Sequence, residues 1–458
     1  MARSVLSQSN GEFWLADGIG EHMRGQLELP VGDRASVVLD GVIPDDPTVT
    51  VERTGPTTTT TTLSADPEKH VQAFAPRDLH GVLDTSEQVS LVEARNHGGS
   101  GHFGAPFFEP DAAIFGAHVT RDQPYTAIRF RLDDPSWLVH LTDGDSAVVP
   151  DDHSILRAEV TDGTAWLVYE SAQPSDLDQL MRRAVSGCRA LAWLVLDRQL
   201  VVMRTQVRIS DGPWLRVHGA NFEHEEPVEW KKPLLDPALL TVEKFAEWIA
   251  MHSRLDGLDW AVMELDSDRP VEVRAMLGTT LIEGFHRRLP FPQKRFPEAS
   301  KNALRAIRSA ATAAAEAEAR KHQGVDPEAV REAVRAAVGH LGDVGFSARV
   351  RDMQAEVADV VPDLIAAVPD IAQLYKNARN DLAHHLRPRD GVHGASFLRW
   401  AASAHSLPWF LRAFLLTRAG YDHAALAEAI DKRDRYQYEC ANTRAFLREL
   451  QRVEAETQ

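Results

Sequence analysis

The strongest constraint on the fold is a change in the spacing of apolar residues near residue 240. Before it, short segments such as 126–132 and 164–169 alternate apolar and polar side chains and are bounded by Gly, Pro, Asp or Asn, which is typical of antiparallel strands. Beyond it, apolar residues recur at helical spacing, and residues 301–322 are rich in alanine, a strong helix former. We therefore predict an α+β protein with a β-rich N-terminal domain over residues 1–239 and an all-α region over residues 240–458.

Further elements can be predicted inside these two regions. An amphipathic helix is expected over residues 175–195, within the β-rich part. Asp326 followed by Pro327 has the pattern of a helix N-cap with proline at the first helical position. Residues 395–418 and 423–455 are predicted to form further helices of the C-terminal bundle.

The acidic charge of the chain is confined to its first part. The whole chain has a formal net charge of −17, but residues 271–458 contain 27 basic and 24 acidic residues, a charge of +3. Residues 1–270 hold the remaining 23 basic and 43 acidic residues, a charge of −20. The C-terminal part is therefore able to accept a polyanion, whereas the N-terminal part as a whole would repel one.

Composition and motifs argue against several classes of protein. The only cysteines are Cys188 and Cys440, which argues against a disulfide framework and a cysteine-based zinc site. No apolar run approaches the roughly 20 residues needed to span a bilayer, and the first residues lack the apolar core of a secretory signal. Neither a Walker phosphate loop nor a G-x-S-x-G motif is present. We expect a cytoplasmic protein with no membrane partner, no metal and no other cofactor.

One helix of the C-terminal region carries the residues that indicate chemistry. Pro369 and Asp370 predict its start, and Pro388 predicts its end. A single apolar stripe runs along it, formed by Ile371, Leu374, Tyr375, Ala378 and Leu382. This stripe is expected to face the core of the bundle and to leave the other side of the helix for polar residues.

The polar side of this helix brings together Asn377, Asn380 and His384, with Arg379 on its flank. The stripe of amides and an imidazole holds few free charges, unlike a face kept soluble by lysine and glutamate. The alternative interpretation is a solvated helix face that ends in residues suited to the C-terminal helix dipole. Arg379, Asn380 and His384 together form the pattern R-N-x-x-x-H.

This pattern resembles the motif of the HEPN superfamily, whose members are small α-helical bundles. The chain is more specifically similar to the ApeA-like HEPN proteins of bacterial antiphage defence. Residues 11–15 followed by 25–29 resemble the start of the β-rich N-terminal domain of that family, as do residues 79–83 and 116–118. Residues 281–288, Leu-Ile-Glu-Gly-Phe-His-Arg-Arg, resemble its first HEPN helix.

The resemblance implies a metal-independent endoribonuclease that acts as a toxin in abortive infection. A phage component would trigger it, and cleavage of host RNA, with tRNA as the candidate substrate, would halt growth. A histidine with a pKa near neutrality, here His384, suits removal of the proton from the RNA 2′-hydroxyl. Arg379 can bind the phosphate oxygens on which charge develops, and Asn380 could orient the imidazole. The expected products carry a 2′,3′-cyclic phosphate and a 5′-hydroxyl.

Helix geometry adds a condition to this mechanism. Arg379 and His384 are about 140° apart around the helix axis, so one helix cannot easily bring both to one phosphate. Two antiparallel copies would supply a histidine from one and an arginine from the other, as in HEPN nucleases, so we expect a homodimer with a composite site. Glu283 is a candidate anchor for Arg379, with an ordinary ion pair as the alternative. Lys376 and Asn377 are candidates for contact with RNA phosphate.

Two other function classes stay open from the sequence. A HEPN domain can serve as a non-catalytic dimerisation or antitoxin partner, in which case the β-rich domain would bind a ligand. His97 and His102 could belong to a metal-dependent hydrolase, although a glycine-rich turn with exposed histidines is the favoured interpretation. In the nuclease hypothesis the acidic N-terminal domain is a sensor that repels RNA or covers the catalytic groove until it is displaced.

Overall fold

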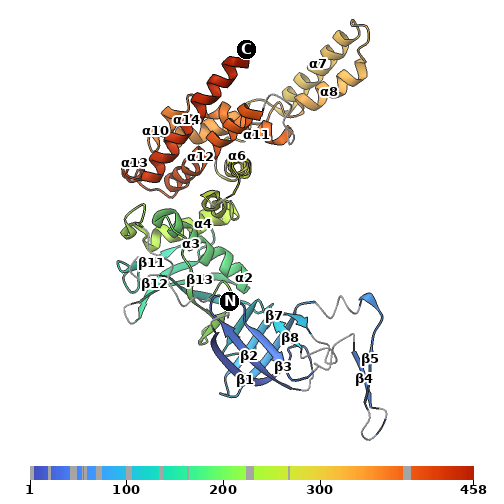
Figure 1. Cartoon of the computed structure of the whole chain (residues 1–458), viewed down its shortest axis with the longest axis vertical. Coiled ribbons are helices and arrows are strands. Elements are labelled where there is room, and N and C mark those ends of the chain that lie inside the picture. Colours follow the sequence, from blue (N-terminus) through green and yellow to red (C-terminus); the bar gives the residue numbers. More distant parts are fainter. Residues whose placement is uncertain are drawn as a thin grey trace. The chain divides into compact units, whose positions relative to one another are not determined.

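The computed structural model describes residues 5–18, 22–41, 49–53, 55, 59–68, 75–98, 106–133, 138–161, 164–222, 232–266, 269–384 and 393–457. The chain divides into two compact units, Met1–Ser253 and Arg254–Gln458. All of the named strands lie in the first unit, and the second is built from helices (Figure 1). The predicted α+β class is therefore confirmed. None of the described helices is both long and apolar enough to cross a membrane.

Alternating burial along the strands produces the sheets of the first unit. The strands are β1 (Val5–Leu15), β2 (Met23–Pro30), β3 (Ser36–Leu39), β4 (Val49–Arg53), β5 (Thr59–Leu63), β6 (Arg77–Leu83), β7 (Gln88–Gly98), β8 (Phe107–Glu109), β9 (Ala112–Phe115), β10 (Tyr125–Leu132), β11 (Ser146–Val148), β12 (Ile155–Thr161), β13 (Thr164–Ser175), β14 (Val202–Arg208) and β15 (Trp214–His218). Except for the β4–β5 pair, the named strands form one sheet in the order β11-β12-β13-β10-β14-β15-β9-β7-β6-β1-β2-β3-β8. Its neighbouring strands are antiparallel, which matches the alternating pattern of the sequence.

One end of this sheet closes into a barrel. Strand β8 pairs with both β3 and β7, so β7, β6, β1, β2, β3 and β8 form a closed ring. Buried apolar side chains fill it, among them Phe13, Leu27 and Leu91. Gly81 is required in the barrel wall, because a Cβ there would lie 2.6 Å from the ring of Phe13.

Helices cover one face of the remaining strands. They are α2 (Leu177–Leu180), η2 (Met181–Val185) and α3 (Ser186–Leu196), close to the predicted range of 175–195. Arg183 of η2 donates from Nε to the hydroxyl of Tyr169 on β13 at 2.8 Å, which places these helices on the face that Tyr169 shares with Ile128. The next long helix, α4 (Val242–Leu255), also packs here, because His252 contacts the carbonyl of Arg182 at 3.0 Å. The division between the two compact units falls within α4, after Ser253, and the domain boundary near residue 240 stays a prediction.

The second unit is a bundle around one apolar helix. Its elements are α5 (Leu258–Met263), η4 (Glu264–Asp266), α6 (Val271–Arg288), α7 (Lys301–Ala319), α8 (Pro327–Gly339), α9 (Phe346–Val357), α10 (Pro362–Ala367), α11 (Ile371–His384), α12 (His393–Arg418), α13 (His423–Asp431) and α14 (Asp434–Thr457). The short helix η3 (Pro237–Leu239), which precedes α4, belongs to the first unit. Helix α12 is buried on all sides over residues 406–416, as expected for a helix that is apolar all round. It contacts α6, α9, α11, α13 and α14.

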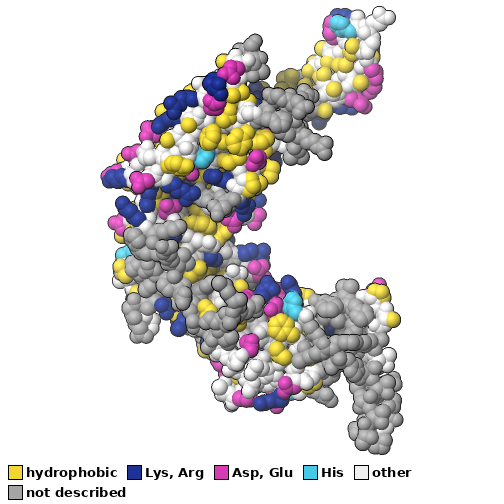
Figure 2. All heavy atoms as spheres, viewed as in Figure 1, with side chains coloured by type: hydrophobic (Ala, Val, Ile, Leu, Met, Phe, Trp, Pro, Cys, Tyr) yellow, Lys and Arg dark blue, Asp and Glu magenta, His cyan; other side chains and the backbone are white. Residues whose placement is uncertain are grey.

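Helices α7 and α8 form a hairpin with little buried surface. Asp326 caps α8 by accepting from the backbone N–H of Glu328 at 3.0 Å, as the sequence predicts. Within the two helices, only Ala319 is buried. Hydrophobic side chains lie on the visible surface of this hairpin (Figure 2), and Ile307 is 52% exposed.

Candidate functional site

Helix α11 has the start and the buried stripe that the sequence predicts. The carboxylate of Asp370 accepts from the backbone N–H of Gln373 at 2.9 Å and so caps the first turn. Ile371, Tyr375 and Ala378 are fully buried against the rest of the bundle. The helix packs on α6, α9 and α12, which determines the direction in which each polar residue of α11 points.

Arg379 lies between α6 and α9, where two contacts hold its guanidinium. Its Nη2 donates to Oε2 of Glu283 on α6 at 2.8 Å. Its Cζ lies 5.0 Å from the ring centre of Phe346 at the start of α9, which is within the range of a cation–π contact. The side chain of Arg379 is still 43% exposed, whereas that of Glu283 is 23% exposed. The guanidinium is therefore oriented by the fold and accessible to a ligand.

Glu283 serves more than one arginine. Its Oε1 accepts from Nη2 of Arg287 at 2.6 Å, one turn further along α6. Arg349 on α9 lies in the same electrostatic environment: burial lowers its pKa, the charge of Glu283 opposes this, and the charges of Arg287 and Arg379 lower it further. Asp343 also attracts the charge of Arg349. Glu283 itself contacts two guanidinium groups, those of Arg379 and Arg287, and two guanidinium groups at one carboxylate are suited to binding a phosphate group.

Arg349 contributes a second observation to this cluster. It is 7% exposed, and its Nε donates to the carbonyl of Val344 at 3.1 Å. Its Nη1 is buried and has no hydrogen-bond partner within the described part of the chain. A buried guanidinium with a spare donor is costly unless another group satisfies it.

The other predicted residues occupy different parts of α11. Asn380 and Lys376 are exposed. His384 is the last residue of the helix, and its side chain lies outside the described residues. Asn377 is half-buried, and its Oδ1 accepts from Nε2 of Gln373 at 2.7 Å. The structure therefore brings Glu283 to Arg379 and places Asn377 on the other side of the helix, about 160° from Arg379.

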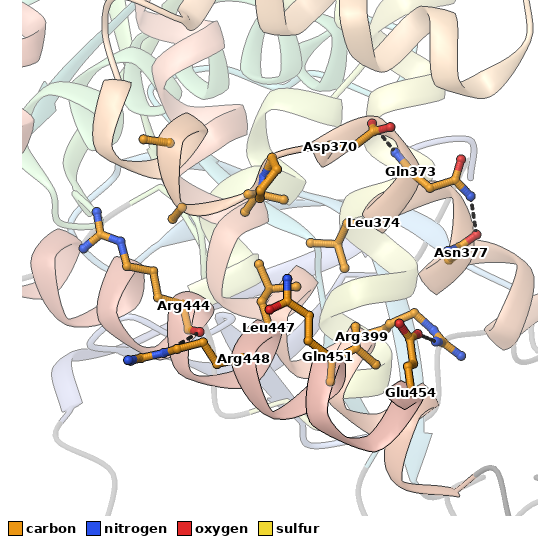
Figure 3. A pocket seen from close by; sticks show the side chains of 15 residues that line it. Asp370, Gln373, Leu374, Asn377, Arg399, Arg444, Leu447, Arg448, Gln451 and Glu454 are labelled. Atoms are coloured by element: carbon orange, nitrogen blue, oxygen red, sulfur yellow. Dashed lines mark hydrogen bonds and ion pairs between the residues drawn. The ribbon is translucent and has the colours of Figure 1, made fainter. Parts of the chain in front are cut away.

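Asn377 belongs to a pocket between α11 and α14. The pocket has a volume of about 600 Å³, and Leu374, Leu447 and Leu450 are among its apolar lining residues. Figure 3 shows Asp370, Gln373 and Asn377 along its α11 side and Arg444, Arg448 and Gln451 along α14.

The charged groups at the ends of this pocket differ in their partners. Arg399 of α12 is held by two carboxylates, with Nε 2.8 Å from Asp381 and Nη1 2.9 Å from Glu454. The Nη2 of Arg444 donates to the carbonyl of Asp363 at 3.2 Å, and its carboxylate is 3.9 Å away. Arg448 donates from Nε to the carbonyl of Arg444 at 3.4 Å. The pocket thus offers amide, guanidinium and carboxylate groups over an apolar floor.

Sequence reasoning missed Phe346, Arg287 and Arg349. Arg287 follows Glu283 by four residues on one helix, so helical spacing would have indicated their contact. Phe346 and Arg349 come from a separate helix, and no local pattern connects them with Arg379. Their positions follow from the packing of α9 against α6 and α11.

No metal centre is found among the residues that the structure describes. None of their His, Cys, Asp and Glu side chains form a group of three or more that could hold a metal ion. His97 lies beside a carboxylate instead, with Nε2 3.3 Å from Oε2 of Glu109, and His102 lies outside the described residues. Cys188 and Cys440 are both buried and free.

Comparison with other proteins adds no assignment to this geometry. No family model, curated protein or solved structure matches the chain. The resemblance to HEPN proteins stays a prediction from the R-N-x-x-x-H pattern and the segments that accompany it.

Proposed function

We propose that the helical unit is an endoribonuclease of HEPN type that cleaves RNA without a metal ion. The observation that supports this proposal best is the geometry of Arg379. Its guanidinium is oriented by Glu283 and Phe346, is 43% exposed, and belongs to the same helix as His384. The exposed guanidinium of Arg287, which contacts the same carboxylate, also favours binding of a phosphodiester at this place.

The proposed reaction is an attack of the RNA 2′-oxygen on the adjacent phosphorus. His384 removes the 2′-proton, the bond from O2′ to phosphorus forms, and the bond from phosphorus to O5′ breaks. A proton delivered to O5′ gives a 5′-hydroxyl, and the other product ends in a 2′,3′-cyclic phosphate. Arg379 neutralises charge on the non-bridging oxygens. Asn380 orients the imidazole, and Lys376 and Asn377 contact the RNA beside it.

We propose that two copies of the chain complete the site. Arg379 and His384 are about 140° apart on α11, so Arg379 of one copy acts with His384 of the other. The test mixes Arg379→Ala protein with His384→Ala protein after each is shown to be inactive. Random mixing makes half of the dimers heterodimers, and each heterodimer has one intact site and one site that lacks both residues. About a quarter of the wild-type activity should therefore return. Absence of any recovery contradicts the composite site.

Cleavage itself is tested on purified tRNA and ribosomal RNA in the presence of EDTA. Wild-type protein should produce fragments with 2′,3′-cyclic phosphate and 5′-hydroxyl ends, and Arg379→Ala should be slower by a factor of about 100 or more. Arg452→Ala is the matched control, because Arg452 is an exposed arginine of α14 that pairs with Glu449 and Glu456. If wild-type protein cleaves no RNA but forms a stable dimer, the non-catalytic alternative is the better explanation.

The resemblance extends the proposal to defence against phage by abortive infection. Bacteria that express the wild-type chain should form fewer plaques when challenged with a phage that carries the trigger. Cells expressing His384→Ala should show no protection. Equal protection by the two proteins would exclude RNA cleavage as the cause of the defence.

A further inference from the structure

One face of the sheet in the first unit carries several arginines, although the net charge of residues 1–270 is negative. The helices η2 and α3 cover the face that includes Ile128 and Tyr169. Side chains on the opposite face follow from the register of the strands. The charged residues of this face in β12, β13, β10, β14 and β15 are Arg129, Arg131, Arg157, Arg204, Arg208 and Arg216, together with Glu159 and Glu170.

Half of these arginines are neutralised within the face. Arg129 lies between two indoles, with Cζ 4.7 Å from the ring centre of Trp166 and 4.6 Å from that of Trp214. It also donates to Glu159 at 3.1 Å. Arg157 and Arg208 share Glu170, at 3.2 and 3.1 Å. These contacts stabilise the sheet and use both carboxylates of the face.

Arg131, Arg204 and Arg216 have no carboxylate partner among the described residues. Arg131 on β10 is directly opposite Arg204 on β14. Arg216 on β15 is opposite Gln206, two residues from Arg204, which makes it a diagonal neighbour of Arg204. Arg204 and Arg216 are exposed, and Arg216 also lies over the ring of Phe115 at 4.3 Å. Arg131 lies over the ring of Trp166, 5.7 Å from its centre. The three arginines therefore occupy neighbouring positions of one face with no carboxylate between them, and this set is called the arginine cluster below.

This cluster costs stability unless an anion occupies it. Like charges placed directly opposite each other on neighbouring strands destabilise a sheet. The Nε of Arg131 is buried and has no hydrogen-bond partner in the described structure. Burial lowers the pKa of Arg131, and the charge of Arg204 lowers it further. An anionic ligand bound to the exposed guanidinium groups would relieve the repulsion.

We propose that this face binds the phosphodiester backbone of a single-stranded nucleic acid through Arg131, Arg204 and Arg216. The guanidinium fork matches phosphate oxygens, and a cluster that spans adjacent strands can contact successive phosphates of one strand. The exposed guanidinium planes of Arg204 and Arg216 offer surfaces on which bases stack. A carboxylate-rich peptide would use the positive charge but not these planes, so nucleic acid fits the face better.

The inference goes beyond the proposed nuclease and does not depend on it, because the residues belong to the other unit. It also differs from the expectation that the acidic N-terminal part repels RNA. The charge of −20 is the sum over all of residues 1–270 and does not describe each surface within them. Locally, the unpaired arginines give the face the opposite sign, and electrostatic attraction acts mainly within about a Debye length, roughly 10 Å at 0.1 M salt.

The experiment measures binding of fluorescent single-stranded oligodeoxythymidine by anisotropy, with full-length protein over a range of salt concentrations. DNA lacks the 2′-hydroxyl, so it binds without the proposed cleavage. Changing Arg131, Arg204 and Arg216 together to Gln should weaken binding at least tenfold near 0.1 M salt. It should also make the negative slope of log affinity against log salt concentration shallower by about 2, since each phosphate contact on a single strand contributes about −0.7 to that slope. The corresponding change of all three residues to Lys should preserve the slope.

The control removes the same charge from paired arginines of the same unit. Arg24, Arg34 and Arg182 each lie within 3.0 Å of a carboxylate oxygen, and their joint change to Gln should leave affinity and slope nearly unchanged. Thermal unfolding must show that all variants are folded. The proposal is overturned if the first triple variant binds like wild type or if the control loses as much affinity. It is also overturned if poly-glutamate displaces the oligonucleotide better than oligouridine of equal charge does.

Discussion

Glu283→Gln is the change that most directly tests how the candidate site works. Glutamine keeps the shape of the side chain but removes the charge that Arg379 contacts at 2.8 Å. Two unit charges at about 4 Å interact with roughly 1 kcal/mol in water and several times that in a less polar environment. The side chains of Arg379 and Glu283 are 43% and 23% exposed, so the pair behaves more like a surface ion pair than a buried one. Solvent screening therefore leaves about 1 kcal/mol for its contribution to the stability of the fold.

The effect of this change on catalysis should exceed its effect on folding. Without the charge of Glu283 the guanidinium of Arg379 gains rotamer freedom, Arg287 loses its anionic partner, and Arg349 loses one opposite charge nearby. A loss of about 1.4 kcal/mol in transition-state stabilisation lowers kcat about tenfold. We expect KM not to rise, because removal of the negative charge of Glu283 increases the attraction for RNA. Glu283 is then a positioning residue for Arg379.

The assay combines initial rates of tRNA cleavage with urea unfolding of the same preparations. Glu449→Gln is the control, since Glu449 pairs with Arg452 on the exposed side of α14; it should leave kcat unchanged. A Glu283→Gln protein with wild-type kcat would refute the reasoning. So would a loss of activity fully explained by the unfolded fraction, because Glu283 would then act on stability alone.

Three further predictions concern stability. Gly278→Ala should lower the free energy of unfolding by about 1–3 kcal/mol, because its Cβ would lie 2.7 Å from a leucine of α12. Gly339→Ala is the control, because a Cβ there would have no atom within 4 Å. It should be neutral or slightly stabilising in thermal unfolding. Burial lowers the pKa of His286, so the folded state favours the neutral imidazole. The contribution of this residue to the free energy of unfolding should be fully present above about pH 6.5 and should fall as the pH decreases below that value. In urea titrations, His286→Gln should reduce this dependence of stability on pH. Arg204→Gln removes the repulsion with Arg131 and should stabilise the protein by about 0.2–1 kcal/mol; a lower midpoint of thermal unfolding would contradict the argument for an unpaired cluster.

Local sequence patterns account for much of the secondary structure. Alternation of apolar and polar residues predicts β10 and β13, and the order Asp326-Pro327 predicts the start of α8. The start of α11 follows from the capping carboxylate of Asp370. These features depend on neighbours within a few residues, so the chain itself contains the information. The contact between Glu283 and Arg379 was a candidate on similar grounds, because both residues belong to recognisable helices.

Contacts between distant segments could not be derived in this way. The closure of the barrel depends on pairing of β8 with β7 as well as β3, and periodicity within a strand does not select its partner. The positions of Phe346 and Arg349 beside Arg379 follow from packing of three helices. Net charge likewise gave no indication of the arginine face, because Arg131 and Arg204 are far apart in the chain.

The sequence by itself therefore determined the α+β class, the polar side of α11 and the presence of Arg379, Asn380 and His384 on one segment. Only the tertiary structure decided which residues of other helices lie beside Arg379 and which arginines remain without a carboxylate partner. The physical reason is that periodicity and capping act over one or two turns, whereas electrostatic environment is set by sheet register and helix packing.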